Sequence, residues 1–209
     1  INEFPYSDMV VENLKRTKKQ REYEILDTGV FDKDEYFDFF LEYAKGAPYD
    51  FLLRAEVHNR SNKDAALTLL PTFCFRNTWS SGRDSNIPEI SEVSPTEMLI
   101  KHHTLGDYHV YFGEEVKEQM YCDNATNRVR LYGVPNKQSN YPKDAINDYI
   151  INGKKTLNPK KKGTKSSAHY KVMVPAGGSK TVEIRMSSVA LSQPFADYQE
   201  LLNKRKAEA

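Results

Sequence analysis

Residues 51–82 read FLLRAEVHNRSNKDAALTLLPTFCFRNTWSSG and contain the clearest fold signal in the chain. Apolar and polar residues alternate over 51–57 and again over 67–75, and a period of two predicts strands with one buried face. In the first strand the alternation predicts that Phe51, Leu53, Ala55 and Val57 face inward. The intervening run 58–64 is polar and rich in side chains that satisfy turns. The sequence therefore predicts that the two strands pair as a hairpin.

The second strand of this stretch ends in a group of residues suited to binding. Pro71 cannot donate a hydrogen bond to a sheet, so the strand is predicted to lie at an edge or to be bulged there. Its end brings Arg76, Asn77 and Trp79 to a rim of the fold. A planar cation, an amide and an indole can bind a sugar or pack at a domain interface. A Trp at a strand end also commonly fills the core, where its N–H finds a partner.

Further alternating segments predict that most of the chain is sheet. Strands are expected at 23–31, 36–43, 97–103, 108–112, 118–121, 169–174 and 181–189. The strands over 97–121 form a predicted meander, with a turn at Gly113-Glu114, and the Gly pair within 175–179 predicts a tight reversal. Apolar residues at helical spacing predict helices at Ser7–Gln20 and from Pro194 onward. The expected fold is an all-β antiparallel super-β-sandwich with short flanking helices near the N- and C-termini.

Two segments lack this alternation. Residues 83–95 are predicted to form a long loop. Residues 128–167 contain several Gly and Pro but also Tyr and Ile side chains, which is too apolar a composition for a disordered linker. We expect this second segment to be an ordered excursion with a short helix near Lys143–Tyr149, and its lysines to be solvated.

Composition excludes several classes of partner. Thirty Lys and Arg against 29 Asp and Glu give a net charge of +1, so no overall field favours nucleic acid or an acidic membrane. No apolar run approaches the ~18 residues of a membrane span, and no signal peptide is visible. The compartment is left open, with the cytoplasm favoured, because an export signal can lie upstream of Ile1. Cys74 and Cys122 are far apart in the sequence, and their spacing indicates neither a zinc site nor a disulfide framework. Both are expected to be buried free thiols.

The sequence predicts neither a metal site nor a cofactor. His102 and His103 are neighbours on a predicted strand and should point to opposite faces, so they cannot share a metal ion. Residues 32–35 are acidic but lack the pattern of a calcium loop, and an ordinary solvated turn is expected. The basic residues of 15–21 suit the C-terminal end of a helix and lack the interleaved aromatic residues of a nucleic-acid site. No nucleophile, phosphate-loop or dinucleotide motif occurs.

Six segments resemble, in the same order, the N-terminal region of bacterial proteins in glycoside hydrolase family 63, the mannosyl-oligosaccharide glucosidase family. They are EFPYSDMVVEN, EYEILDTGVFDKDEYFDFFLEYAK, LLPTFCFRNTWSSG, YGVPN with KDAINDYIINGKKTLNP, GTKSSAHYKVMVPAGGS and PFADYQELLNKRKAEA. The resemblance covers nearly the whole chain. One departure is Ser81, because the family is expected to carry a second aromatic residue two positions after the Trp.

The resemblance implies a domain without its own catalytic residues. Family members pair an N-terminal super-β-sandwich with a C-terminal (α/α)6 barrel that holds the catalytic carboxylates. Residues 1–190 would then form the sandwich, and 191–209 a linker helix leading to the barrel, which is absent from this chain. The implied partners are that barrel, in the same polypeptide, and an oligosaccharide substrate. An autonomous carbohydrate-binding β-sandwich is the alternative.

These expectations define one candidate cleft or interface. We expect Arg76, Asn77 and Trp79 to lie at one rim of the sandwich, facing the barrel. The loops expected near them carry Asn136, Asp144, Asn147, Asp148 and His169. None of these residues is assigned a catalytic role.

Overall fold

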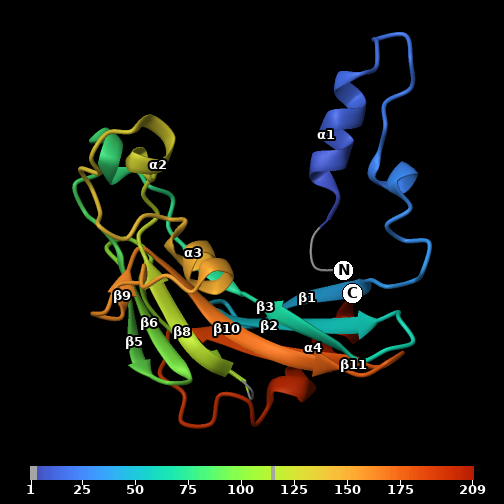
Figure 1. Cartoon of the computed structure of the whole chain (residues 1–209). Helices are drawn as coiled ribbons and strands as arrows, with labels where there is room; N and C mark the ends of the chain where they lie inside the picture. Colours follow the sequence, from blue (N-terminus) through green and yellow to red (C-terminus); the bar gives the residue numbers. More distant parts are fainter. Residues whose placement is uncertain (1–3, 114–115) are drawn as a thin grey trace. The chain divides into compact units, whose positions relative to one another are not determined.

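A computed structural model describes residues 4–113 and 116–209. The expected turn at Gly113-Glu114 and the beginning of the N-terminal segment lie in part outside the described residues. Two sheets of seven and four strands dominate the fold, and the few helices are short (Figure 1). The predicted all-β, antiparallel, sandwich-like class is therefore confirmed.

The larger sheet has the strand order β1-β2-β11-β7-β6-β5-β9. Its strands are β1 (Phe37–Ala47), β2 (Asp50–Asn59), β5 (Glu89–Ser94), β6 (Glu97–His102), β7 (Gly106–Phe112), β9 (Lys162–Gly163) and β11 (Ser179–Ser187). Strands β5, β6 and β7 pair antiparallel in sequence order, as a meander does. Strand β5 lies inside the predicted 83–95 loop, so that expectation was wrong for its second half.

The smaller sheet is built around one long strand. Its members are β3 (Ala65–Leu69), β4 (Thr72–Cys74), β8 (Val116–Cys122) and β10 (Lys165–Val174). Strand β10 pairs antiparallel with both β4 and β8. The predicted interruption at Pro71 is confirmed, because β3 ends before it and β4 begins after it. The Pro71 carbonyl accepts hydrogen bonds from Ala168 N at 3.1 Å and Ser167 Oγ at 3.0 Å.

The predicted hairpin of 51–57 with 67–75 was wrong. Strand β2 belongs to the larger sheet, whereas β3 and β4 belong to the smaller one, so the polar run 58–64 connects two sheets. The prediction of which β2 side chains face inward was also wrong at the start of the strand. Leu52, which is outside the predicted inward-facing set, is 1% exposed, whereas Phe51 and Leu53 are only partly buried. Alternation identifies two faces, but it does not identify which sheet or helix covers either face.

Within residues 4–113 and 116–209, four α-helices accompany the sheets. They are α1 (Tyr6–Leu14), α2 (Arg128–Tyr132), α3 (Ala145–Asn152) and α4 (Tyr198–Glu208). Helix α3 confirms the short helix expected near Lys143–Tyr149, and α2 was not predicted. Helix α1 ends six residues before the predicted Gln20, because Asn13 hydrogen-bonds both the N–H and the carbonyl of Tyr23 at 2.8 Å.

The strand predicted at 23–31 is absent from the described residues. A 3₁₀ turn occupies Ile25–Thr28 instead. Its N-terminus is a reciprocal capping box between Glu24 and Asp27, and Gly29 follows with a left-handed φ of 70°. These local hydrogen bonds compete successfully with the weak alternation of this segment.

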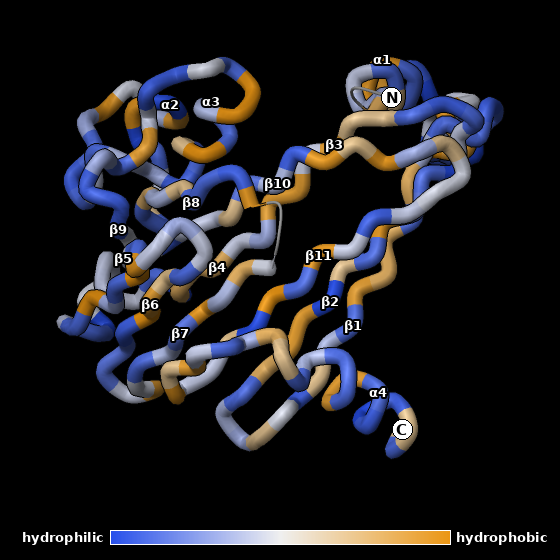
Figure 2. Tube along the Cα trace, turned by 90° about the horizontal axis from the view of Figure 1, so that it is seen from below, coloured by the Kyte–Doolittle hydropathy of each residue, from blue (hydrophilic) through white to orange (hydrophobic). Residues whose placement is uncertain are grey.

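The chain divides into two compact units, which we describe separately. The smaller unit contains the residues up to Phe40 together with Glu56–Ala66 and Met173–Thr181, and the larger contains Leu41–Ala55, Leu67–Val172 and Val182–Ala209. In the larger unit, Phe73 of the smaller sheet meets Phe112 of the larger sheet edge-on, with ring centroids 6.3 Å apart. Figure 2 shows hydrophobic and hydrophilic positions alternating along several of the strands. The core of this unit therefore lies between the two sheets.

Helix α4 packs on the larger unit through its apolar face. Tyr198 and Leu202 are each 1% exposed and form a cluster with Leu52 of β2. At the start of the helix, the buried Arg185 guanidinium binds Asp50 (Nη2–Oδ2 2.7 Å), the Pro194 carbonyl (2.8 Å) and Asp197. The carboxylates of Asp50 and Asp197 raise the pKa of Arg185 above its usual range. These contacts fix 194–209 to the sandwich.

Candidate functional site

The predicted residues Arg76 and Trp79 line one hollow of about 460 Å³ in the larger unit. Trp79 begins a 3₁₀ turn (Trp79–Ser81) and is half-buried, so its indole lies neither in the core nor free in solvent. Arg76 is exposed, and its guanidinium has no partner among residues 4–113 and 116–209. The segment that follows β4 therefore carries both side chains into the same hollow.

The two adjacent histidines form another wall of this hollow. Their rings stack, with centroids 4.7 Å apart and planes 19° from parallel. His102 is the last residue of β6 and His103 lies in the following turn, so the prediction that they point to opposite faces was wrong. Backbone N–H groups of Thr104 and Leu105 donate to His102 Nδ1 at 3.2 Å, which leaves the proton of a neutral ring on Nε2.

Among the described residues, one carboxylate contacts the histidine pair. Asp84 Oδ2 lies 3.3 Å from His103 Nε2. A hydrogen bond from the Asn86 backbone N–H lowers the pKa of Asp84. Cys74 also lines the hollow and is exposed, so the prediction of a buried thiol was wrong for Cys74. For the buried Cys122 it is confirmed, and burial raises the pKa of that thiol to about 12.

Asn77 lies next to the hollow but has a structural role. Its Nδ2 donates to the Asn124 carbonyl at 2.9 Å, and its Oδ1 accepts from Ser80 N at 3.0 Å. Asn124 in turn donates to the Phe75 carbonyl at 2.7 Å. Both ends of the Asn77 amide are thus used to hold 75–80 against 124. Of the three predicted residues, this leaves Arg76 and Trp79 as the ones that a ligand or partner can contact.

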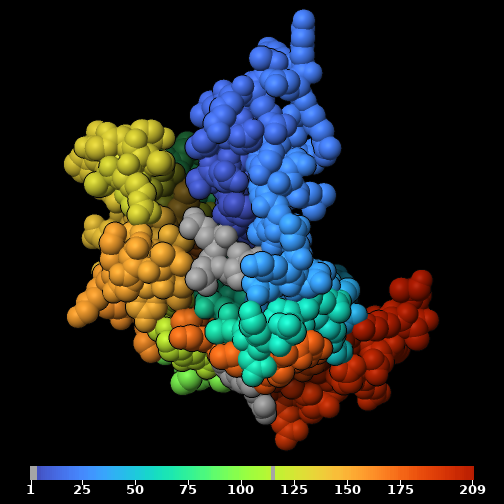
Figure 3. Space-filling view, turned by 45° about the vertical axis from the view of Figure 1, so that its right-hand side comes forward, coloured from blue at the N-terminus to red at the C-terminus, as the bar shows by residue number. Residues whose placement is uncertain are grey.

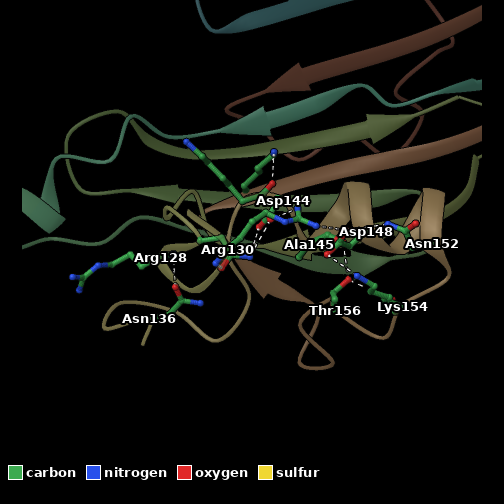
Figure 4. Close-up of polar contacts among 12 residues, drawn as sticks. Arg128, Arg130, Asn136, Asp144, Ala145, Asp148, Asn152, Lys154 and Thr156 are labelled. Carbon is green, nitrogen blue, oxygen red and sulfur yellow. Dashed lines mark hydrogen bonds and ion pairs between the residues drawn. The ribbon is translucent and has the colours of Figure 1, made fainter. Parts of the chain in front are cut away.

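Asn136, Asp144 and Asp148 line a separate hollow of about 310 Å³, on and around α2 and α3. Figure 4 shows Arg130 of α2 directed between the two carboxylates, while the Arg128 guanidinium points away from them. Arg130 Nη1 binds Asp144, and Nη2 lies 2.9 Å from Asp148 Oδ1. One arginine therefore cross-links the two helices.

Other side chains complete this ion-pair network. Asp144 Oδ2 accepts from Asn127 Nδ2 at 3.0 Å, and Asp148 Oδ1 accepts from Asn152 Nδ2 at 3.1 Å. Lys154 Nζ lies 3.6 Å from Asp148 Oδ2. Hydrogen bonding from Arg130 holds the pKa of Asp148 below its usual range. A general acid for glycoside hydrolysis needs a raised pKa, so Asp148 is not arranged to donate a proton.

His169 and Asn147 lie apart from both hollows. His169 was expected at the start of the 169–174 strand, beside the loops near Trp79, but it lies within β10 and is buried, opposite Glu118 of β8. Its Nδ1 is 3.0 Å from Glu118 Oε1, and Tyr149 Oη donates to Glu118 Oε2 at 3.0 Å. The hydrogen bond to Glu118, together with burial, raises the pKa of Tyr149. Asn147 is exposed on α3. His169 is thus part of the packing of α3 on the smaller sheet.

The predicted site residues therefore divide among three places in the larger unit. Arg76 and Trp79 share one hollow, and Asn136, Asp144 and Asp148 share another that has no lining residue in common with the first. Sequence reasoning missed Arg130, which organises the second hollow. The one available signal was Asn127, a favoured N-cap residue directly before an amphipathic segment, and its Oδ1 does cap α2 through Arg130 N at 3.1 Å.

Two further searches concern chemistry outside these hollows. Within the described residues, no three His, Cys, Asp or Glu side chains are placed to hold a metal ion together. Among the helices in the same part of the chain, none is long and apolar enough to cross a membrane.

Comparison with known proteins gives one relative and no family. The chain is 31% identical over 220 residues to the uncharacterized protein YMR196W of Saccharomyces cerevisiae. The alignment covers 88% of this chain but 20% of the yeast protein, so the chain spans about a fifth of the length of the curated relative it matches. No family model matches the chain.

Proposed function

We propose that this chain is the non-catalytic N-terminal β-sandwich of an inverting glycoside hydrolase similar to family 63. In this proposal the enzyme acts on α-linked glucosides or oligosaccharides. The sandwich, residues 1–190, packs on a C-terminal (α/α)6 barrel of the same polypeptide and shapes one wall of its substrate cleft. Residues 191–209 lead to the barrel, which supplies the catalytic carboxylates.

The main support is an apolar stripe on α1, in the smaller unit. Tyr6, Val10 and Leu14 recur every four residues and so lie on one face of the helix. They are 61%, 60% and 80% exposed, and none of the nine residues of this helix is buried. Short helices gain most of their stability from packing of the apolar face, so this stripe is suited to a partner surface.

The size of the yeast relative is consistent with such a partner. A chain that aligns with 20% of a relative leaves room in that protein for at least one further large domain. A domain in the same polypeptide is the simplest cover for the α1 stripe, because the effective concentration of a linked domain is high. Within the larger unit, Val129, Leu131 and Tyr132 of α2 are also more than half exposed, and Figure 3 shows this segment projecting at the surface.

The role that we propose for Arg76 and Trp79 is to form the cleft wall or to support a barrel loop that does. An indole that is half-buried beside an unpaired guanidinium suits an interface that is partly apolar and partly hydrated. A hollow containing a Trp and an Arg also favours the second candidate, an autonomous carbohydrate-binding module. The two candidates differ in whether the chain binds an oligosaccharide without the barrel.

The test combines two measurements. The purified 209-residue chain should neither hydrolyse nor bind α-linked gluco-oligosaccharides, as followed by reducing-sugar release and calorimetry. In the full-length enzyme, Trp79→Ala should raise KM or lower kcat while circular dichroism shows an unchanged sandwich. Turnover by the isolated chain, or unchanged kinetics in Trp79→Ala, would refute the packing role. Oligosaccharide binding by the isolated chain that Trp79→Ala abolishes would instead establish the binding module.

A further inference from the structure

Residues of the polar loop 136–140 line two hollows that share three lining residues. Asn136, Asn140 and Tyr141 line both the 310 Å³ hollow at α2 and α3 and a neighbouring hollow of about 510 Å³. The second hollow extends toward the 158–162 turn that precedes β10. We call the two hollows together the amide groove. Each of the two volumes lies within the range of small-ligand sites.

Every carboxylate that lines the amide groove is already neutralised or hydrogen-bonded. Asp144 and Asp148 bind Arg130, and Asp148 also has Lys154 nearby. Asp123 accepts from Ser139 Oγ at 2.5 Å and from Thr164 N at 3.1 Å. None of these acidic groups is therefore available to attract a cation or to accept further from a ligand without breaking an existing contact.

The cationic groups at the groove are, by contrast, largely unpaired. Lys137, Lys155 and Lys160 line it and are exposed. Within the part of the chain that the structure describes, their ammonium groups contact no carboxylate. The local potential is therefore positive, although the net charge of the whole chain is only +1.

Unpaired amides line the same hollows as these lysines. The side chains of Gln138 and Asn140 have no hydrogen-bond partner among the described residues, and Asn136 uses only its Oδ1, which accepts from Arg128 N at 2.7 Å. An amide presents both donors and an acceptor and so matches hydroxyl groups. The ring of Tyr141 is half-buried at the boundary of the two hollows and adds an apolar surface.

From this arrangement we propose that the amide groove binds a small polyhydroxylated anion, such as a sugar that carries a phosphate or carboxylate group. Lys137, Lys155 and Lys160 attract and pair with the anionic group. Gln138, Asn140 and the free Nδ2 of Asn136 bind hydroxyl groups. This proposal concerns the isolated chain and an anionic ligand, and it does not depend on the packing role proposed above.

Calorimetric titration of the 209-residue chain tests the proposal, with glucose 6-phosphate, gluconate, inorganic phosphate and glucose as probes. At low salt we expect binding of glucose 6-phosphate or gluconate, and the tighter of the two identifies the anionic group. Inorganic phosphate should bind more weakly, and glucose should give no measurable heat. Binding should weaken at about 1 M salt, where the Debye length is about 3 Å.

Substitutions at the groove provide the second arm. Combined Lys137→Gln, Lys155→Gln and Lys160→Gln should weaken binding about tenfold or more, since each exposed ion pair contributes little alone and three are removed. Lys171→Gln, on an exposed position of β10, is the matched control and should leave binding unchanged. Asn140→Ala should reduce the preference for glucose 6-phosphate over phosphate. Failure of both anionic sugars to bind, equal binding of glucose, or an equal effect of Lys171→Gln would overturn the proposal.

Discussion

Helices α1 and α4 have similar apolar spacing but opposite surroundings. In α4, Tyr198 and Leu202 are buried against Leu52, and Arg185 fixes the start of the helix. In α1, the stripe of Tyr6, Val10 and Leu14 is exposed. The apolar face of α4 is thus buried within the chain, whereas the apolar face of α1 is exposed. The difference indicates which helix serves the fold of the sandwich and which is available to a partner.

The largest expected effect is the loss of the ion pair that holds α4. Arg185→Met should lower the free energy of unfolding by about 3–5 kcal/mol, because it leaves the buried Asp50 carboxylate without its cation. Urea unfolding followed by circular dichroism measures this. Arg16→Met, near the end of α1, is the control and should have a much smaller effect, since its contact with Glu12 is at the surface. Equal effects would contradict the distinction between the two helices.

Matched truncations of the two apolar faces should differ nearly as much. Leu202→Ala should cost about 2–5 kcal/mol, because it opens a cavity beside Tyr198 and Leu52. Leu14→Ala should change stability by no more than about 0.5 kcal/mol, because Leu14 is 80% exposed. Thermal or urea unfolding of the two variants makes the comparison. A large cost of Leu14→Ala would mean that α1 is already packed within this chain.

A smaller loss of stability is expected from a substitution where β1 packs against α4. A Cβ added at Gly46 would lie 2.2 Å from Asp50 Oδ2 and 3.2 Å from Leu201 Cδ1. Gly46→Ala must therefore displace the carboxylate that binds Arg185, at a cost of about 1–3 kcal/mol. Gly178→Ala is a suitable control, because its added Cβ would meet its nearest neighbour at 3.2 Å, the side chain of Pro175. If Gly46→Ala destabilises no more than the control, the packing of α4 is looser than described.

The smallest effect concerns pH. Hydrogen bonding from Arg185 holds the pKa of Asp197 below its usual range. A carboxyl with a lowered folded-state pKa contributes stability that is fully present above its unfolded pKa, about 3.9, and is lost as the pH falls through the folded value. Between pH 7 and pH 3, wild type should therefore lose slightly more stability than Asp197→Asn. An identical loss in wild type and Asp197→Asn would contradict this linkage.

Much of the fold follows from local sequence, but the partners of the strands do not. Alternation located β1, β6, β7 and β11 closely, and Pro71 marked a real interruption. The pairing of β3 with β10, about a hundred residues away, depends on tertiary packing that no local pattern specifies. The 3₁₀ turn at Ile25–Thr28 was missed although the capping pair Glu24 and Asp27 is visible in the sequence.

The candidate site depends more on the folded structure than the strands do. Arg76 and Trp79 line one hollow, whereas Asn136 and Asp144, which were expected near them, line another. The hydrogen bond from Asn77 to Asn124 and the ion pair between Asp148 and Arg130 can be recognised only from the folded positions of residues 124–156. Polar residues in the irregular segment 128–167 show no periodicity from which their spatial neighbours can be deduced.

The central claim is that a further domain of the same polypeptide covers the α1 stripe. Its most direct test is calorimetric titration of this chain with the barrel domain that we propose lies in the same polypeptide. The account predicts specific association that Val10→Ser combined with Leu14→Ser weakens at least about tenfold, while Val189→Ser, an exposed apolar residue outside the stripe, has no effect. Absence of association, or association that the double substitution leaves unchanged, would contradict the account.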